Sequence, residues 1–417
     1  MGGAGATDPL LRSAPAGELE VAREGAAPGK ERQAVAARNA IFHIRRRGRR
    51  ATRLLLAGAA LLAIALVAAP AAGASVPRRF YGIVPGTPLT DPDFNRMGNA
   101  RVGSLRQQFF WPGIQPKRGG PLHWAAIDAV VARAAQQHIS ILPILVGTPG
   151  YEAHGCKSQD CRGHISLGTK RHRRDWQAFV KAAVRRYGRH GEFWNANSSF
   201  PYEPITRWQI WNEQNNPNER NPARLYGRLV TASDKALHGV DPKAQTVLGG
   251  MFGTPPGGKS STAWGYLRAL YKGRARRHFD AVALHPYSPT ISGIRAQIRR
   301  VRRVLKSHHD GNRQILITEI GWGSSRKHHA GTGSRGAVFN VGPKQQKRKL
   351  ARSFGMLTSN RRSWRIGGVY WFDWRDPKHP PAGLCAFCYS SGLYKADGKT
   401  AKPALSAYKR FTRKARG

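Results

Sequence analysis

After residue 75, apolar and polar positions follow one repeating order along the chain. A short apolar or β-branched run comes first, then a loop rich in Gly, Pro or polar residues, and then a stretch with helical apolar period. Eight runs predict strands: FYGIVPG from Phe80, ARVGSLRQQFF from Ala100, ISILPILVG from Ile139, TRWQIWNE from Thr206, AQTVLGGMFG from Ala244, FDAVALHPY from Phe279, QILITEIGW from Gln314 and IGGVYWFDW from Ile366. The clearest predicted helices cover 124–138, 174–188, 223–239 and 294–309.

This alternation predicts an α/β fold with a parallel sheet covered by helices. Eight units in about 340 residues fit a closed (β/α)8 TIM barrel with insertions. An open doubly wound sheet is the alternative, but the first run is not followed by a G-x-G-x-x-G phosphate loop. Because no polar linker divides residues 78–417, we expect them to form one catalytic domain.

The N-terminal region has a different pattern. A basic run at 45–50 precedes an apolar stretch at 54–74, whose length of about 20 residues matches the bilayer core. The small residues at 72–74 are typical of a signal peptidase site, so cleavage near Ser75 is predicted, with a retained anchor as the alternative. Residues 1–53 are predicted to be a disordered basic tail. The chain is therefore expected to be secreted or held at the cell surface.

The charge balance narrows the partners. Lys and Arg number 69 against 23 Asp and Glu, a formal net charge of +46, of which +6 lies in residues 1–53 and +40 in the remainder. Such a surplus favours an anionic partner. Export makes nucleic acid a poor candidate and leaves an acidic polysaccharide or another anionic envelope polymer. A general surplus of arginine on a solvated surface is the alternative explanation.

The four cysteines form two close pairs, Cys156 with Cys161 and Cys385 with Cys388. In an exported protein such pairs predict local disulfides. The run HGCKSQDCRGH at 154–164 also resembles a zinc knuckle in its ligand types, so a metal site is the alternative.

Two of the eight runs end in glutamate. Glu213 closes the fourth run and Glu319 the seventh, and functional groups in such barrels lie at the carboxyl ends of strands. A carboxylate beside Trp211 would be partly desolvated and suited to donate a proton, whereas one beside an arginine stays ionised and suits a nucleophile. Cleavage of a glycosidic bond needs this division of labour. A structural ion pair with arginine is the alternative for each glutamate.

Three motifs in this order resemble a known group of proteins. W-N-E ends the fourth run, H-P-Y the sixth and T-E-x-G-W the seventh, as in the clan A glycoside hydrolases, in particular families 39 and 5 and related cellulase-like enzymes. The resemblance covers roughly residues 80–411 and implies the (β/α)8 fold. One position departs from it, because Gln214 stands where many relatives have proline after W-N-E. That departure leaves the assignment to one named family open.

The resemblance also implies roles for individual residues. Glu213 would be the general acid/base and Glu319 the nucleophile of a retaining double displacement, with Arg106 holding the nucleophile ionised and Asn212 bonding the sugar 2-hydroxyl. His285 and Tyr287 match the strand-six pair of the family, with Tyr287 donating to the nucleophile, and Trp371 matches its aromatic sugar platform. Further sugar-contact candidates, each equally suited to packing, are Trp111, Trp211, Trp322 and Trp374.

The sequence thus predicts an exported retaining glycoside hydrolase acting on a β-linked polysaccharide, with an acidic one favoured by the charge. We expect no cofactor, no metal and no nucleic acid partner, and membrane contact only through residues 54–74 if they are retained. One alternative is a non-catalytic barrel that tethers the envelope to a glycan. Another is a transglycosylase that uses the same carboxylate pair.

Overall fold

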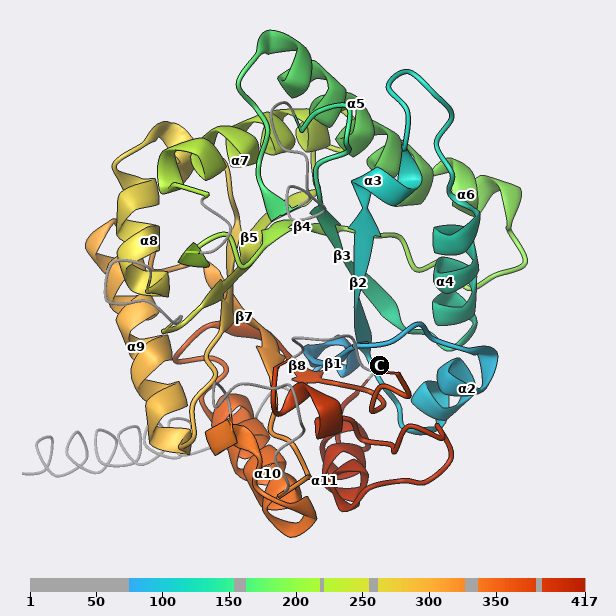
Figure 1. The fold of residues 1–417 in the computed structure, drawn as a ribbon, viewed down its shortest axis with the longest axis vertical. Helices are drawn as coiled ribbons and strands as arrows, with labels where there is room; N and C mark the ends of the chain where they lie inside the picture. The colour runs from blue at the N-terminus through green and yellow to red at the C-terminus, as the bar shows by residue number, and fades with distance from the viewer. Residues whose placement is uncertain are drawn as a thin grey trace, which may run out of the picture. The chain divides into compact units, whose positions relative to one another are not determined.

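Eight parallel strands close into one barrel, with each strand paired to its neighbours in chain order and β8 paired to β1 (Figure 1). The computed structural model describes residues 75–153, 163–217, 221–254, 262–326, 337–379 and 385–416. The strands are β1 Tyr81–Val84, β2 Ser104–Phe110, β3 Ser140–Val146, β4 Arg207–Asn212, β5 Gln245–Phe252, β6 Ala281–His285, β7 Gln314–Ile320 and β8 Ile366–Phe372. All eight predicted runs contain a strand, and the predicted (β/α)8 barrel is confirmed.

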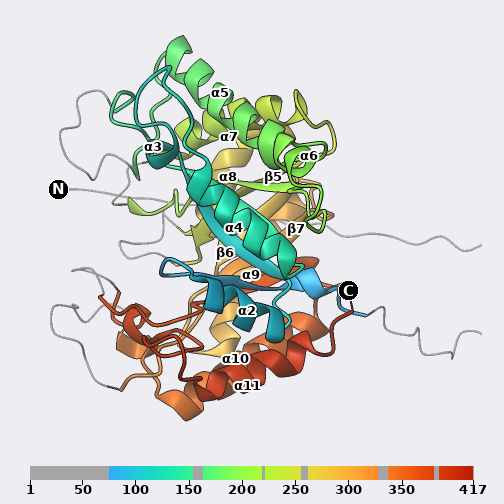
Figure 2. The ribbon, with the colours of Figure 1, turned by 90° about the vertical axis from the view of Figure 1, so that its right-hand side faces the viewer.

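Helices surround the barrel and cover the outer face of its strands (Figure 1). They are α2 Asp91–Asn99, α3 Trp111–Ile114, α4 Ala125–Gln136, α5 Lys170–Tyr187, α6 Glu192–Ala196, α7 Ala223–His238, α8 Ala263–Tyr271, α9 Ile291–Ser307, α10 Pro343–Ser359 and α11 Pro403–Thr412. The four clearest predicted helices correspond to α4, α5, α7 and α9. Figures 1 and 2 both show α10 and α11 side by side.

Helix α9 illustrates why these segments are helical. The Thr290 hydroxyl accepts the backbone N–H of Gly293 at 3.1 Å and so caps the first turn. Buried apolar residues then recur at helical spacing, and the positions between them are largely arginine. The buried apolar set is Ile294, Ile298, Val301, Val304 and Leu305. The apolar stripe packs onto the barrel and leaves most of the arginines in solvent, whereas Arg302 is buried and donates to the backbone carbonyls of Arg313 and Trp364.

Aliphatic side chains, among them Val84, Leu142, Val247 and Leu316, fill the barrel interior together with one large ring. Ala281, Ala283 and Tyr370 belong to the inner cluster, and a Cβ atom at Gly82 would lie 2.3 Å from the Tyr370 ring. The Tyr370 hydroxyl bonds that of Ser104 at 2.9 Å. This layer closes the barrel below Arg106, the next inward-facing residue of β2 after Ser104, so the polar groups beyond it gather at the carboxyl ends of the strands.

The barrel belongs to a unit that runs from Ser75 to Gly417. The predicted tail and the apolar stretch 54–74 lie outside the described residues, as do Cys156 and Cys161. No described helix is long and apolar enough to cross a bilayer. The predicted disulfide between Cys385 and Cys388 is present, with their Cα atoms 5.2 Å apart.

Candidate active site

The end of β4 has an irregular backbone. Trp211 and Glu213 have φ angles of 69° and 48°, a left-handed region that costs a non-glycine residue about 1–3 kcal/mol. The bend at Trp211 interrupts the alternation of the strand. The Trp211 ring packs against Trp176 of α5, with centroids 6.3 Å apart, and the next residue, Asn212, reaches Arg106 inside the barrel. Glu213 follows at the barrel mouth, where its N–H bonds the carbonyl of Gly250 at 2.9 Å.

Arg106 on β2 connects three neighbouring side chains. Its Nη1 donates to Oε1 of Glu319 at 2.6 Å, its Nη2 to Oδ1 of Asn212 at 2.6 Å, and its Nε to Oε1 of Gln209 at 3.0 Å. The Arg106 side chain is 1% exposed, so this charge is fully desolvated and acts at short range. The predicted contact between Arg106 and the nucleophile candidate is therefore present, and Asn212 is held beside it.

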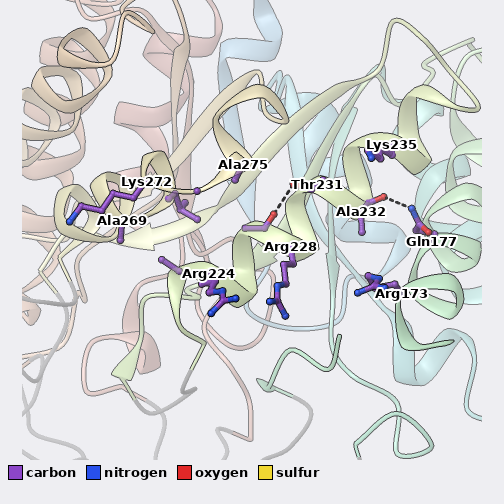
Figure 3. Close-up of a pocket in the computed structure, with 14 residues that line it drawn as sticks. Arg173, Gln177, Arg224, Arg228, Thr231, Ala232, Lys235, Ala269, Lys272 and Ala275 are labelled. Atoms are coloured by element: carbon purple, nitrogen blue, oxygen red, sulfur yellow. Dashed lines mark hydrogen bonds between the residues drawn. The ribbon is translucent and has the colours of Figure 1, made fainter. Parts of the chain in front are cut away.

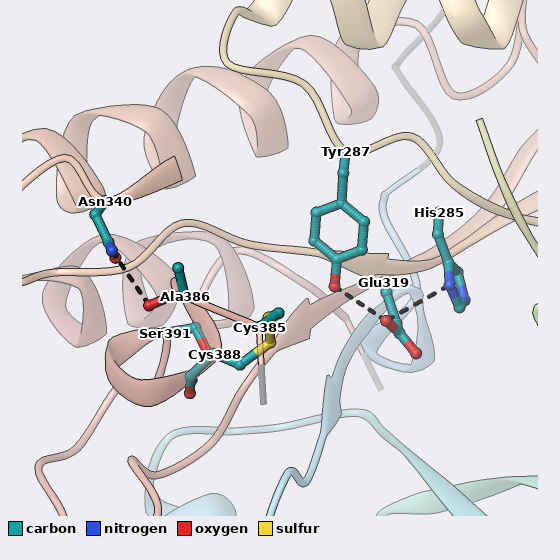
Figure 4. Close-up of a disulfide and its surroundings, with 8 residues drawn as sticks. All are labelled: His285, Tyr287, Glu319, Asn340, Cys385, Ala386, Cys388 and Ser391. Carbon is teal, nitrogen blue, oxygen red and sulfur yellow. Dashed lines mark hydrogen bonds and ion pairs between the residues drawn. A yellow bond between two sulfur atoms is a disulfide. The ribbon is translucent and has the colours of Figure 1, made fainter. Parts of the chain in front are cut away.

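Glu319 at the end of β7 receives a second donor on its other oxygen. The Tyr287 hydroxyl donates to Oε2 of Glu319 at 3.0 Å, as predicted (Figure 4). Burial, followed by the nearby charges of Glu319 and Glu213, raises the pKa of Tyr287 well above its ordinary value. Tyr287 thus keeps its proton at any ordinary pH. Glu319 therefore accepts one hydrogen bond on each of its oxygens.

Glu213 has a different partner, His285 at the end of β6. The Nδ1 atom of His285 lies 2.8 Å from Oε1 of Glu213 and 3.5 Å from Oε2 of Glu319. Burial, and then the charge of Arg106, lower the pKa of His285 well below its ordinary value, so the ring is neutral. The neutral ring thus holds the Glu213 carboxyl group by a short contact that adds no positive charge.

Glycine at position 250 makes room for this histidine. A Cβ atom on Gly250 of β5 would lie 2.0 Å from Nε2 of His285, closer than any two such atoms approach. Asn215 fixes the neighbouring loop, since its amide exchanges two hydrogen bonds of 2.8 and 2.9 Å with the backbone of Phe252. Gln214, at the position of the family's proline, is buried and donates to the carbonyl of Gly249 at 3.2 Å.

The two carboxylates are close together. One ligand atom each from Glu213, His285 and Glu319 lies within 4.8 Å of the others. The two carboxylates therefore face the same space at the mouth of the barrel. Within the described part of the chain, the same three residues are placed so that they could hold a cation.

The prediction that Trp371 forms a sugar platform is wrong in this structure. Its ring is 0% exposed and packs 6.3 Å from Phe354 of α10 and 6.1 Å from Trp322, with Nε1 donating to the carbonyl of Ser391 at 3.1 Å. The reason is strand alternation. Tyr370 faces the barrel interior, so Trp371 faces the helices.

The other tryptophan candidates also pack in the core. The rings with almost no exposed surface are those of Trp111, Trp211, Trp322 and Trp374. The Trp211 ring packs against Trp176 of α5, and the contact seen for Glu213 is with His285. These contacts therefore give no support to the predicted desolvation of Glu213 by Trp211.

Phe372 is the aromatic residue that the sequence analysis missed. It is partly exposed at the end of β8 and packs against the inner cluster of the barrel. Phe387, inside the loop closed by Cys385 and Cys388, lies 6.4 Å from Phe372 and 5.2 Å from Tyr287. The disulfide loop thus forms a wall beside Tyr287 and Glu319 (Figure 4). Phe372 follows the alternation of β8 from Tyr370, whose inward direction the sequence does not reveal.

Comparison with known proteins agrees with this arrangement at the level of the fold. No protein-family model matches the sequence, and no curated protein matches it. A family 39 glycoside hydrolase from the gut symbiont Bacteroides cellulosilyticus WH2 superimposes with a TM-score of 0.60 and 17% identity, over 81% of this chain and 64% of that one. The chain therefore spans less than two thirds of that relative.

Two further solved structures give similar values. A GH39 β-xylosidase from Caulobacter crescentus has a TM-score of 0.55 and 18% identity, over 81% of this chain and 72% of that one. A GH5_18 protein from Streptomyces cattleya in complex with GlcNAc has a TM-score of 0.55 and 14% identity, over 81% of this chain and 80% of that one. The fold is that of glycoside hydrolase families 39 and 5, as the motif resemblance predicted.

Proposed function

We propose that this protein is a retaining glycoside hydrolase that cleaves β-linked glycans, with Glu213 as acid/base and Glu319 as nucleophile. The observation that carries the proposal is the carboxylate pair: ligand atoms of the two groups lie within 4.8 Å, and Glu319 is bound by a buried arginine. Proteins of this fold include a β-xylosidase, which supports a β-linked substrate. The positive charge of the chain favours an acidic glycan.

The first step forms a glycosyl ester. Glu213 gives its proton to the glycosidic oxygen while Oε2 or Oε1 of Glu319 attacks the anomeric carbon, and the bond from that carbon to the leaving oxygen breaks. In the second step Glu213 takes a proton from water, whose oxygen attacks the same carbon and releases Glu319. Arg106 and Tyr287 stabilise Glu319 before attack and after release. Asn212, held by Arg106, is placed to bond the 2-hydroxyl of the sugar.

The test uses azide rescue on a panel of 2,4-dinitrophenyl β-glycosides. For Glu319→Ala, added azide should attack the anomeric carbon from the vacated side and yield the α-glycosyl azide. For Glu213→Ala, azide should intercept the glycosyl ester and yield the β-glycosyl azide. Glu192→Ala, an exposed glutamate at the start of α6, is the control and should keep the parent rate. Parent rates in both mouth variants would rule out this mechanism.

We also propose that the chain is exported, on the basis of the basic run and apolar stretch before Ser75. N-terminal sequencing of the protein recovered from culture medium and from membranes tests this. A start near Ser75 in the medium would support cleavage, and an intact N-terminus in the membrane fraction would support a retained anchor. Full-length protein confined to the cytoplasm would contradict export.

A further inference from the structure

A groove of about 800 Å³ lies on the outer surface of the barrel along α7, between α5 and α8 (Figure 3). Helix lengths explain it. Helix α8 has 9 residues, whereas its neighbours α7 and α9 have 16 and 17, so α8 leaves part of the outer face of α7 uncovered. Small residues line the groove and keep it open: Ala223, Gly227, Thr231, Ala232, Ala269, Gly273 and Ala275.

Among the described residues, the rim of this groove carries only positive charge. The charged residues that line it are Arg173, Arg224, Arg228, Lys235 and Lys272, with no acidic residue among the described lining. Within the described ranges, none of the five forms an ion pair with a carboxylate. The contrast with the neighbouring face is clear, because there Arg186 pairs with Asp128 and Arg189 with Asp241. Because the chain has few acidic residues, these five side chains can bind an external anion.

The charges are arranged along a line. Arg224 and Arg228 are one helical turn apart on α7, and Arg224 and Lys235 are separated by about 16 Å along the helix. Figure 3 shows Arg224, Arg228 and Arg173 in a row. Helix α7 follows β4, so Arg224 in its first turn lies near the same end of the barrel as Glu213. A second hollow of about 600 Å³ shares Lys272 and Gly273 and adds Arg276, Arg277 and His278.

We propose that the groove along α7 binds an anionic polysaccharide as a second site, separate from the catalytic residues. Guanidinium groups pair with carboxylates or phosphates in fork geometry, and a linear series of them fits a chain with an anionic group on successive units. The choice of a glycan over other polyanions rests on the proposed glycosidase function. The positive charge of the groove is independent of that function.

The test compares two triple variants of the full chain, each losing two arginines and one lysine. Arg224→Ser/Arg228→Ser/Lys235→Ser removes the groove charges. The matched control, Arg410→Ser/Arg413→Ser/Lys414→Ser, removes exposed charges that line a smaller hollow of about 440 Å³ on α11. Binding of polygalacturonate is measured by calorimetry in a Glu319→Gln background at low and high salt. Fully methyl-esterified polygalacturonate is the uncharged version of the same chain, and a DNA duplex is the competing polyanion.

We expect polygalacturonate to bind the parent, to bind the groove variant about tenfold more weakly, and to bind the α11 variant with nearly parental affinity. Added salt should remove the difference, and the esterified polymer should show none. Equal losses in both triple variants, or a DNA affinity that matches that of polygalacturonate and falls with it in the groove variant, would overturn the proposal. Since binding is measured without turnover, a failure of the proposed hydrolase activity would leave this result readable.

Discussion

The ends of β4 and β7 carry the same residue type in opposite surroundings. Glu319 accepts a hydrogen bond on each oxygen, one of them from a buried guanidinium, and its side chain is 12% exposed. Glu213 contacts a neutral imidazole, is 18% exposed, and sits on left-handed backbone. The two carboxylates therefore differ in the groups that they contact, a guanidinium and a hydroxyl at Glu319 and an imidazole at Glu213. Each prediction below alters one of those neighbouring groups or one of the two carboxylates.

The largest effect should separate the two glutamates by the leaving group of the substrate. Glu319→Gln should lose turnover of every substrate, because no nucleophile remains. Glu213→Gln should lose about 10²–10⁴-fold on glycosides with a poor leaving group and little of the first step on 2,4-dinitrophenyl glycosides, which need no proton. Burst-phase kinetics with both substrate types check this. Equal losses for both leaving groups in Glu213→Gln would contradict the assignment of the acid.

Removing Arg106 should affect both stability and rate. Arg106→Leu breaks three hydrogen bonds, one of which is a buried ion pair, so we expect the free energy of unfolding in urea to fall by about 3–5 kcal/mol. Arg106→Lys keeps the charge but cannot reach three acceptors at once, so it should retain more stability while still losing turnover. If Arg106→Lys kept the parent rate, the forked geometry would have no catalytic importance.

Tyr287→Phe removes one donor to Glu319 and keeps the aromatic ring. A hydrogen bond to a charged group contributes about 1.5–3 kcal/mol, so we expect kcat to fall roughly 10- to 100-fold with little change in KM. Because the pKa of Tyr287 is raised, the parent should show no alkaline loss of activity from this hydroxyl in the ordinary range. A pH–rate profile of the parent and the variant, extended to pH 10, measures both.

Gly250→Ala should displace His285 and thereby affect Glu213, which His285 contacts. The added methyl group would overlap Nε2 of His285, and we expect a loss of about 1–3 kcal/mol in unfolding free energy together with a shifted pH–rate profile. Gly168→Ala is the matched control, because a Cβ there meets nothing within 4 Å. If the two variants were equally stable, the space beside His285 would be large enough for a methyl group, contrary to the structure.

The smallest effect concerns the pH dependence of stability. The pKa of His285 is lowered in the folded state, so between that value and about 6.5 the unfolded chain binds a proton that the folded chain does not. This histidine therefore makes stability fall as pH drops below about 6.5, by at most about 1.4 kcal/mol per pH unit. Urea unfolding of the parent and His285→Asn between pH 5 and 8 should show a flatter dependence in the variant.

The barrel and the carboxylate pair follow from patterns visible in the chain, because strand ends and their polar residues recur at the spacing of βα units. The aromatic lining does not. Tyr370, Trp371 and Phe372 are consecutive, and only the pairing of β8 with β1 decides that Trp371 faces outward. At β4 the left-handed Trp211 changes the alternation, which apolar period cannot reveal. The contact between Gly250 and His285 cannot be predicted from the sequence either, because a glycine does not indicate which side chain lies against it.

The left-handed backbone at Glu213 also matters for anyone engineering this protein. Glycine and asparagine adopt that conformation more readily than glutamate does, so substitutions that relieve it should raise the melting temperature while removing the proposed proton donor. A screen for heat resistance alone would therefore select inactive clones at this codon. Libraries designed to raise the melting temperature of the barrel should therefore keep Glu213 and vary other positions.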